Sequence, residues 1–153
     1  MKIAFLITQL TNIGGAQIHV RDLSTALQAA GHDVSVLAGT DGAFAEGLAQ
    51  RGIPFRVVRH LAHAVNPLGD VRGVFAVRDV LREIRPDILS THSTKAGMVG
   101  RIAGRMLGIP TVFTAHGWGF TEGRPPLQAA AFWAIRWGTR RAHRPGGRAS
   151  MRR

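Results

Sequence analysis

The chain lacks several features that would assign it quickly to a class of protein. It contains no cysteine, which excludes disulfides and thiolate chemistry and suits a reducing compartment. No apolar run approaches the roughly 20 residues needed to span a bilayer. The apolar stretch near the start, residues 3–7, is too short for a signal peptide. We therefore expect a cytoplasmic protein, with at most peripheral contact at the inner face of the membrane.

Acidic residues are scarce, and none follows position 136. The 153-residue chain has 20 Lys and Arg against 9 Asp and Glu, which gives a formal net charge of +11. Seven of the arginines lie from position 136 onward, so the rest of the chain carries 13 − 9 = +4. The body of the protein is therefore only mildly basic.

Established catalytic signatures are also missing. Neither G-x-G-x-x-G nor G-x-x-x-x-G-K occurs, which argues against a nicotinamide-dependent enzyme and a P-loop protein. There is no nucleophile elbow and no obvious pair of catalytic carboxylates. The histidines show no metal-ligand spacing, and His60 and His63 have no acidic companions. We expect neither a metal site nor a cofactor.

Short apolar segments that alternate with helical patterns are what the chain does contain. Strands are expected at residues 2–8, 34–38, 54–58, 88–91 and 110–114. Pro54 lacks the backbone donor of a central strand, so the third strand is expected towards an edge. The alternation predicts an α/β fold, a Rossmann-like parallel sheet with helices on both faces.

Apolar residues at helical spacing predict which faces of the helices are buried. The expected faces are Val20, Leu23, Leu27 and Ala30; Phe44 and Leu48; Leu68, Val71, Val74, Leu81 and Ile84; Val99, Ile102, Ala103, Met106 and Leu107. A last helix is expected to begin at Pro125, since proline is tolerated in a first turn.

Polar clusters follow the first, fourth and fifth expected strands. Gly14 and Gly15 precede a helix whose N–H groups could bind an anion, although a simple tight turn would also use glycine. His92, Ser93, Thr94 and Lys95 form the second cluster, expected as a turn. A hydroxyl of Ser93 or Thr94 could cap the next helix, and Lys95 could bind phosphate or be solvated.

The third cluster is His116 with Gly117, directly after the fifth strand. A lone histidine is more often a structural hydrogen-bonding group than a catalytic base. The carboxyl ends of parallel strands meet at one edge of the sheet, where ligands bind in open α/β folds. That position favours a functional role for His116.

Three segments in this order resemble the amino-terminal half of glycosyltransferase family 4. They are G-G-A-Q at 14–17, RPDILSTHSTKAG at 85–97 and GIPTVFTAHGWGF at 108–120. Those enzymes have the GT-B architecture, two Rossmann-like domains that face each other across a cleft. The resemblance implies that Gly14 and Gly15 approach the donor diphosphate and that His116, near the transferred sugar, is catalytic. It also implies a set of cleft-lining positions: Gln17, His92, Ser93, Thr94, Lys95 and Gly117.

The chain departs from that family pattern at its end. We expect a domain at 1–142 and a basic tail at 143–153, with the donor-binding domain of the family absent. The tail is rich in Arg, Gly, Pro and Ala, which a high-GC gene often yields when it is read in the wrong frame. We therefore interpret the chain as a truncated or frameshifted product.

The resemblance implies an enzyme that moves a sugar from a nucleotide-diphosphate sugar to a glycan or lipid-linked acceptor, inactive as this piece. Aromatic residues at 118–137 interleave with arginines, which suggests reversible contact with an anionic membrane surface. The alternative is a non-catalytic basic module that binds nucleic acid or such a surface. No nucleic-acid recognition motif is present, so we expect no specific nucleic acid partner.

Overall fold

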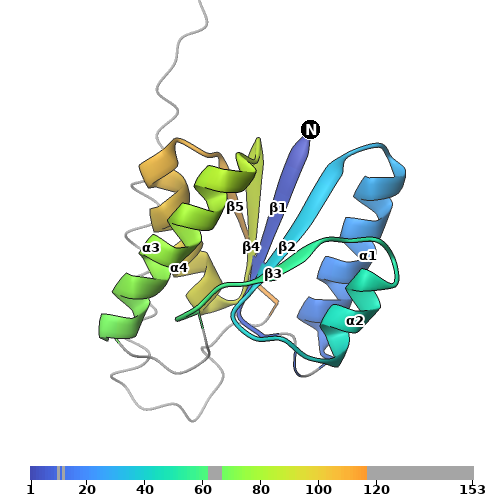
Figure 1. Cartoon of the computed structure of the whole chain (residues 1–153), viewed down its shortest axis with the longest axis horizontal. Coiled ribbons are helices and arrows are strands. Elements are labelled where there is room, and N and C mark those ends of the chain that lie inside the picture. Colours follow the sequence, from blue (N-terminus) through green and yellow to red (C-terminus); the bar gives the residue numbers. More distant parts are fainter. Residues whose placement is uncertain (10, 12, 62–66, 117–153) are drawn as a thin grey trace, which may run out of the picture. The chain divides into compact units, whose positions relative to one another are not determined.

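The computed structural model describes residues 1–9, 11, 13–61 and 67–116 of the chain. Its elements are β1 (Lys2–Ile7), α1 (Gly15–Ala29), β2 (Asp33–Ala38), α2 (Ala43–Ala49), β3 (Phe55–Val57), α3 (Pro67–Ile84), β4 (Ile88–His92), α4 (Thr94–Leu107) and β5 (Thr111–Thr114). The strands form one parallel sheet in the order β3-β2-β1-β4-β5 (Figure 1). The predicted α/β fold is confirmed, and β3 lies at an edge as Pro54 indicated.

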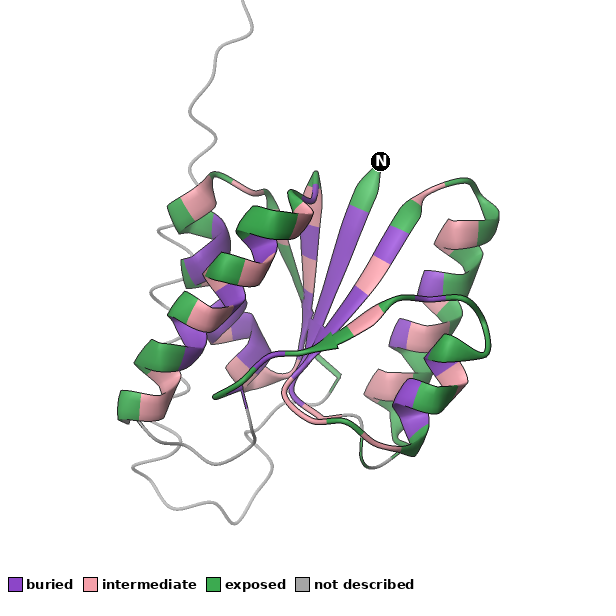
Figure 2. Ribbon diagram, viewed as in Figure 1, coloured by how far each residue is buried: buried purple, intermediate pink, exposed green. Residues whose placement is uncertain are grey.

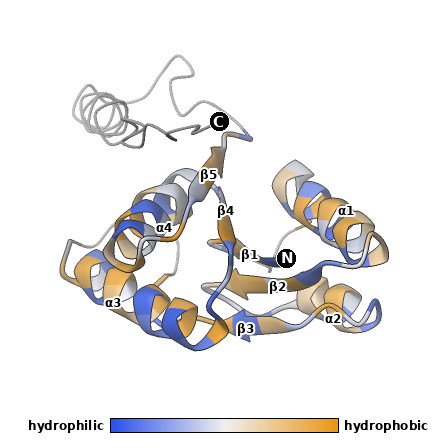
Figure 3. Ribbon diagram, turned by 90° about the horizontal axis from the view of Figure 1, so that it is seen from above, coloured by the Kyte–Doolittle hydropathy of each residue, from blue (hydrophilic) through white to orange (hydrophobic). Residues whose placement is uncertain are grey.

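Helices cover both faces of the sheet, as Figure 3 shows from above. Alternate residues of β1 serve the two faces: Phe5 and Ile7 pack with residues of α1 and α2, while Ala4 and Leu6 pack with residues of α3 and α4. Since both faces are buried, the central strands are almost continuously apolar. Figure 2 shows this as buried strands between helices whose outer sides are exposed.

Helix α4 contacts the sheet through small residues rather than through the large apolar ones. Val99 and Ala103 are buried as predicted, but Ile102 and Met106 are about half exposed, at 47% and 48%. The close approach comes from three glycines, Gly97, Gly100 and Gly104, whose added Cβ atoms would overlap β4, β5 or β1 side chains. The predicted buried face of α4 was therefore wrong by part of a turn. The prediction used the spacing of large apolar residues, and glycine is not counted among them.

The predicted face of α3 needs a similar correction. Leu68 and Val71 in its first turns are exposed, whereas Val74, Val77 and Leu81 are buried. The helix begins at Pro67. Proline suits that position because its missing N–H would be unpaired in a first turn anyway. Among the described residues, no helix is long and apolar enough to cross a bilayer.

Candidate functional site

The strand order changes direction between β1 and β4: β2 and β3 lie on one side of β1, and β4 and β5 lie on the other. The chain leaves β1 for α1 on one face and leaves β4 for α4 on the other, while the two strands pair side by side with Ile7 opposite His92. In open parallel sheets such a switch point opens a crevice at the carboxyl ends of the strands, where ligands bind. The predicted clusters at Gly14–Gly15 and at His92–Lys95 flank this point.

The connection from β1 to α1 presents backbone rather than side chains. Gly14 is the residue before the first helical turn, in an extended conformation with no side chain to cap the helix. Both Gly14 and Gly15 are exposed, and a Cβ at Gly15 would meet no atom within 4 Å. Gln17 accepts a hydrogen bond from the Gly14 N–H at 3.2 Å and donates one to the Gln9 carbonyl at 3.1 Å. Gln17 therefore links the first turn of α1 to the loop, and a helix N-terminus of this kind, preceded by glycine, is a common place for an anion to bind.

The connection from β4 to α4 is a single residue, which corrects the turn expected at 92–95. His92 is the last residue of β4, and Thr94 and Lys95 already belong to α4. Between them Ser93 adopts φ 92°, a conformation that a residue with a Cβ rarely takes. Its hydroxyl caps α4 by accepting from the Ala96 N–H at 3.4 Å, and it lies 2.7 Å from the Thr8 hydroxyl of the neighbouring connection. The predicted cap is confirmed at Ser93.

Three histidines meet at the carboxyl end of β4. His92 is fully buried, and its Nδ1 lies 2.8 Å from Nε2 of His116, which follows β5. His19 of α1 completes the cluster, with its ring centroid 5.1 Å from that of His116 and 5.6 Å from that of His92. One ring nitrogen of each histidine lies within 4.8 Å of the other two. Three elements distant in sequence thus place imidazoles in contact.

Two neighbours fix the orientation of His92. The ring stacks on Phe5 of β1, with the centroids 5.5 Å apart, and Nε2 lies 2.9 Å from the Ser90 hydroxyl. Ile88, Ser90 and His92 alternate along β4 towards the α1 face, which is how the strand aims His92 at His19. Both ring nitrogens of His92 therefore have polar partners although the side chain is buried.

The environment favours the neutral form of two of these side chains, His92 and His116. Burial, and next the neighbouring His116 and His19, lower the pKa of His92 from 6.5 to about 4. Burial, followed by the effect of His19, also lowers the pKa of His116. Neutral imidazole carries one donor and one acceptor nitrogen, so His92 and His116 can each hydrogen-bond, bind a metal or exchange a proton at pH 7.

Lys95 makes an ion pair on α4. Its ammonium lies 2.7 Å from a carboxylate oxygen of Asp70 at the start of α3, and the two side chains are only 12% and 13% exposed. The pair joins the first turns of α3 and α4, a structural role that the sequence did not indicate. Thr94 lies beside it in the first turn and is half-buried.

Several residues of the site were not predicted, and part of the prediction lies outside the described residues. His19, Ser90 and Thr8 had no motif to mark them. The signal for His19 was its position one turn into the helix after Gly14 and Gly15, which places it over the ends of the strands. Gly117, the aromatic and arginine residues of 118–141 and the expected last helix fall outside the described part of the chain.

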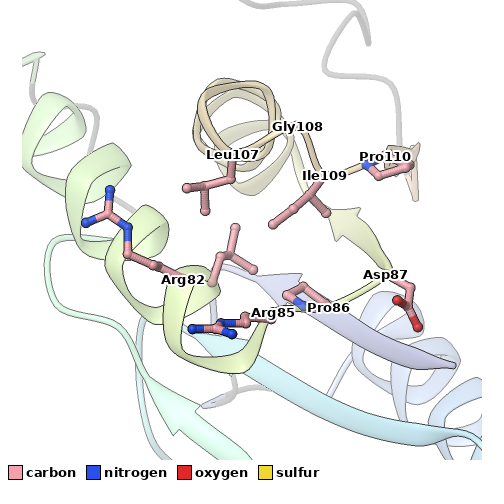
Figure 4. Close-up of a pocket in the computed structure, with 9 residues that line it drawn as sticks. Arg82, Arg85, Pro86, Asp87, Leu107, Gly108, Ile109 and Pro110 are labelled. Carbon is pink, nitrogen blue, oxygen red and sulfur yellow. The ribbon is translucent and has the colours of Figure 1, made fainter.

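A hollow in the described part of the chain lies at the opposite end of the sheet, where β4 and β5 begin. It is an open groove of about 410 Å³ between the end of α3 and the end of α4 (Figure 4). Arg82 and Arg85 line one side, and Leu107 and Ile109 line the other. Asp87 at its rim accepts a hydrogen bond from the backbone N–H of Lys2. None of the predicted site residues in the described part of the chain borders this groove.

Comparison with known proteins places residues 14–144 in the family described as "Glycosyl transferase 4-like domain". A segment of 61 residues is 36% identical to UDP-Gal:alpha-D-GlcNAc-diphosphoundecaprenol alpha-1,3-galactosyltransferase of Escherichia coli. That segment is 39% of this chain and 16% of the length of the relative. The similarity therefore concerns a small part of that enzyme.

Solved structures share the fold over most of the chain. HepE of Anabaena, in complex with UDP and glucose, is 26% identical with a TM-score of 0.69, over 88% of this chain and 35% of HepE. MurG of Acinetobacter baumannii is 19% identical with a TM-score of 0.62, over 85% of this chain and 38% of MurG, which shows the fold alone. The chain thus has the fold of one half of the GT-B architecture and spans about a third of these proteins.

Proposed function

The chain belongs to the glycosyl transferase 4-like family, and on this premise we propose that it forms the acceptor-side domain of an enzyme that transfers a sugar from a nucleotide-diphosphate donor. One observation carries the proposal. The N-terminus of α1 and the His92–His116 pair lie at the same switch point, where a ligand crevice opens in open parallel sheets. A helix N-terminus and neutral imidazoles supply the chemistry that a leaving diphosphate and a sugar hydroxyl need.

Each part of the crevice has a role in this proposal. The N–H groups of the first turn of α1, from Gly15 onward, stabilise the charge that develops on the diphosphate as the sugar leaves, while the Gly14 N–H stays bonded to Gln17. His116, exposed at the mouth, hydrogen-bonds the transferred sugar. His92 holds the ring of His116 in place through the 2.8 Å contact and is itself held by Ser90. Lys95, paired with Asp70, holds the first turn of α4 against α3.

The solved relatives support the proposed class of donor, and the Escherichia coli relative supports the proposed class of acceptor. HepE has been solved with UDP-glucose, at 30% identity over 74% of this chain and 28% of HepE. The Escherichia coli relative acts on a diphosphoundecaprenol-linked sugar, as its name states. We extend these to a nucleotide-diphosphate sugar as donor and a glycan or lipid-linked acceptor, with reaction on the cytoplasmic side. We infer that residues 1–153 alone do not transfer sugar, because in this family a second domain holds most of the donor.

The test replaces residues 143–153 with the carboxyl-terminal domain of HepE and assays sugar transfer from UDP-glucose to a panel of lipid-linked and soluble glycan acceptors. We expect transfer by the chimera and none by residues 1–153. His116→Ala in the chimera should lower turnover at least tenfold with an unchanged melting temperature. His32→Ala, at the far end of α1, is the matched control and should leave turnover unchanged. Normal turnover of the His116→Ala chimera, or transfer by the unmodified chain, would contradict the proposal.

A further inference from the structure

The histidine cluster has more nitrogen donors than sugar transfer uses. His19, His92 and His116 come from α1, β4 and the segment after β5, and a ring nitrogen of each lies within 4.8 Å of the others. His19 and His116 are exposed, whereas His92 is buried beneath them. Packing therefore fixes the position of His92, whereas the exposed side chains of His19 and His116 are free to change rotamer.

We propose that His19, His92 and His116 bind a divalent transition metal ion of the zinc class. Neutral imidazole suits Zn²⁺, Cu²⁺, Ni²⁺ and Co²⁺, whereas Mg²⁺ and Ca²⁺ prefer oxygen ligands. Three protein ligands that leave one position open to solvent are the arrangement of metal sites that bind a further ligand. The proposed sugar transfer does not require the ion, and because it uses His92 and His116 as well, a bound ion would replace their direct contact.

The surroundings of His92 resemble those of a metal ligand in one further respect. A histidine that ligates a metal commonly donates its other ring N–H to a neighbouring acceptor, which fixes the tautomer. Ser90 is placed for this, with its hydroxyl oxygen 2.9 Å from Nε2 of His92. When Nε2–H donates to Ser90, the lone pair of Nδ1 points towards His116 and the open side of the cluster.

Small movements bring the three nitrogens to bonding distance. Zinc–nitrogen bonds are about 2.0–2.1 Å long, so tetrahedral ligand atoms lie a little over 3 Å apart. His92 and His116 are already 2.8 Å apart and must separate slightly, losing their direct hydrogen bond. His19 must approach, which a rotation of its exposed side chain on α1 can supply. A bound ion would then link α1 to the ends of β4 and β5 across the switch point.

The test measures Zn²⁺ binding to the chelator-treated chain of residues 1–153 by calorimetry, without any nucleotide sugar. We expect one ion per chain, and Co²⁺ in its place should give the strong visible absorption of a tetrahedral site. His19→Ala and His116→Ala should each weaken binding at least tenfold, and both replace exposed side chains. Ser90→Ala should weaken it roughly 10–100-fold, the range typical of partners that orient a ligand.

Matched controls separate this site from other histidines. His32→Ala and His143→Ala should bind Zn²⁺ as the unchanged chain does. Binding that survives both His19→Ala and His116→Ala, or that disappears in His143→Ala, would overturn the proposal. So would the absence of one-to-one binding in the folded chain, which would leave His92 and His116 as a hydrogen-bonded pair only. Sugar transfer by the chimera, assayed with EDTA, is independent of all these outcomes.

Discussion

The two connections at the switch point differ in how they bond the backbone N–H groups at the N-terminus of the helix that follows. The connection from β1 to α1 is long and ends at exposed glycines, so the residue before the first turn, Gly14, has no side chain to cap the helix, and Gln17 bonds only the Gly14 N–H. The connection from β4 to α4 is Ser93 alone, which caps its own helix and bonds to Thr8. The N-terminus of α1 is therefore available to a ligand, while that of α4 is already partly satisfied from within the protein.

This difference suits the two connections to different functions. An anion site needs unpaired N–H groups and space, which the glycine connection supplies. Imidazoles that must keep a fixed tautomer need a rigid, dry support, which β4 supplies through Phe5, Ser90 and the close packing of α4.

The largest expected contrast comes from one substitution made on each helix. A Cβ at Gly100 would lie 2.6 Å from Cγ2 of Thr91 and 2.8 Å from Cδ2 of Leu6, whereas one at Gly15 meets no atom within 4 Å. Gly100→Ala should destabilise the protein by about 1–3 kcal/mol, since overpacking forces buried side chains to move. Gly15→Ala should change stability by less than about 1 kcal/mol, in the stabilising direction.

Urea denaturation of both variants beside the unchanged chain measures this contrast directly. Equal stability of the two variants would mean that α4 can move away from the sheet at no cost. The support of His92 would then be less rigid than the packing indicates.

The order of strands and helices could be predicted from the sequence, but the residues through which α4 packs on the sheet could not. The order of strands and helices followed from apolar runs broken by glycine and proline, and Gly108 ends α4 in the left-handed conformation expected of that position. In a sequence, the glycines that allow α4 to approach the sheet closely look the same as glycines that interrupt a helix. The face of α4 was therefore misjudged, and Ile102 and Met106 are exposed.

The separate residue clusters of the site could be predicted from the sequence, but the contacts between them could not. The clusters around Gly14, Ser93 and His116 lie at strand ends, which a pattern of alternating strands and helices places at one edge of the sheet. That His19 joins His92 and His116 depends on β1, β4 and β5 being neighbours, and strand order is not encoded in local periodicity. The pairing of Lys95 with Asp70 likewise depends on how α3 lies against α4.

The second prediction concerns the pH dependence of stability at the β4 connection. The pKa of His92 is about 4 in the folded chain and 6.5 as its ordinary value. Between these values the unfolded chain binds a proton that the folded chain does not, so the free energy of unfolding falls as the pH drops from 6.5 to 4. We expect a loss of about 2 kcal/mol, below the full conversion of the pKa difference because water at the exposed neighbours screens part of it.

Urea denaturation at a series of pH values with EDTA present measures this loss. His92→Asn should flatten the slope whatever its effect on stability at pH 7, and His32→Asn should keep the slope of the unchanged chain. The lowered pKa of His116 acts in the same direction, so some slope should remain in His92→Asn. A slope that His92→Asn leaves intact would place the titration elsewhere.

The smallest expected effect reverses the difference between the two connections by giving α1 the cap that α4 has. Gly14 has φ −125° and ψ −178°, which serine adopts without strain, and its Cβ would meet only the flexible Gln17 amide oxygen, at 3.2 Å. Gly14→Ser should stabilise the chain by a few tenths of a kcal/mol, the usual difference between serine and glycine at this position. Because the new hydroxyl would accept from the same N–H groups that an anion needs, the chimera should bind UDP-glucose more weakly, which appears as a higher KM. A gain in stability with an unchanged KM would mean that the donor diphosphate does not bind at the N-terminus of α1.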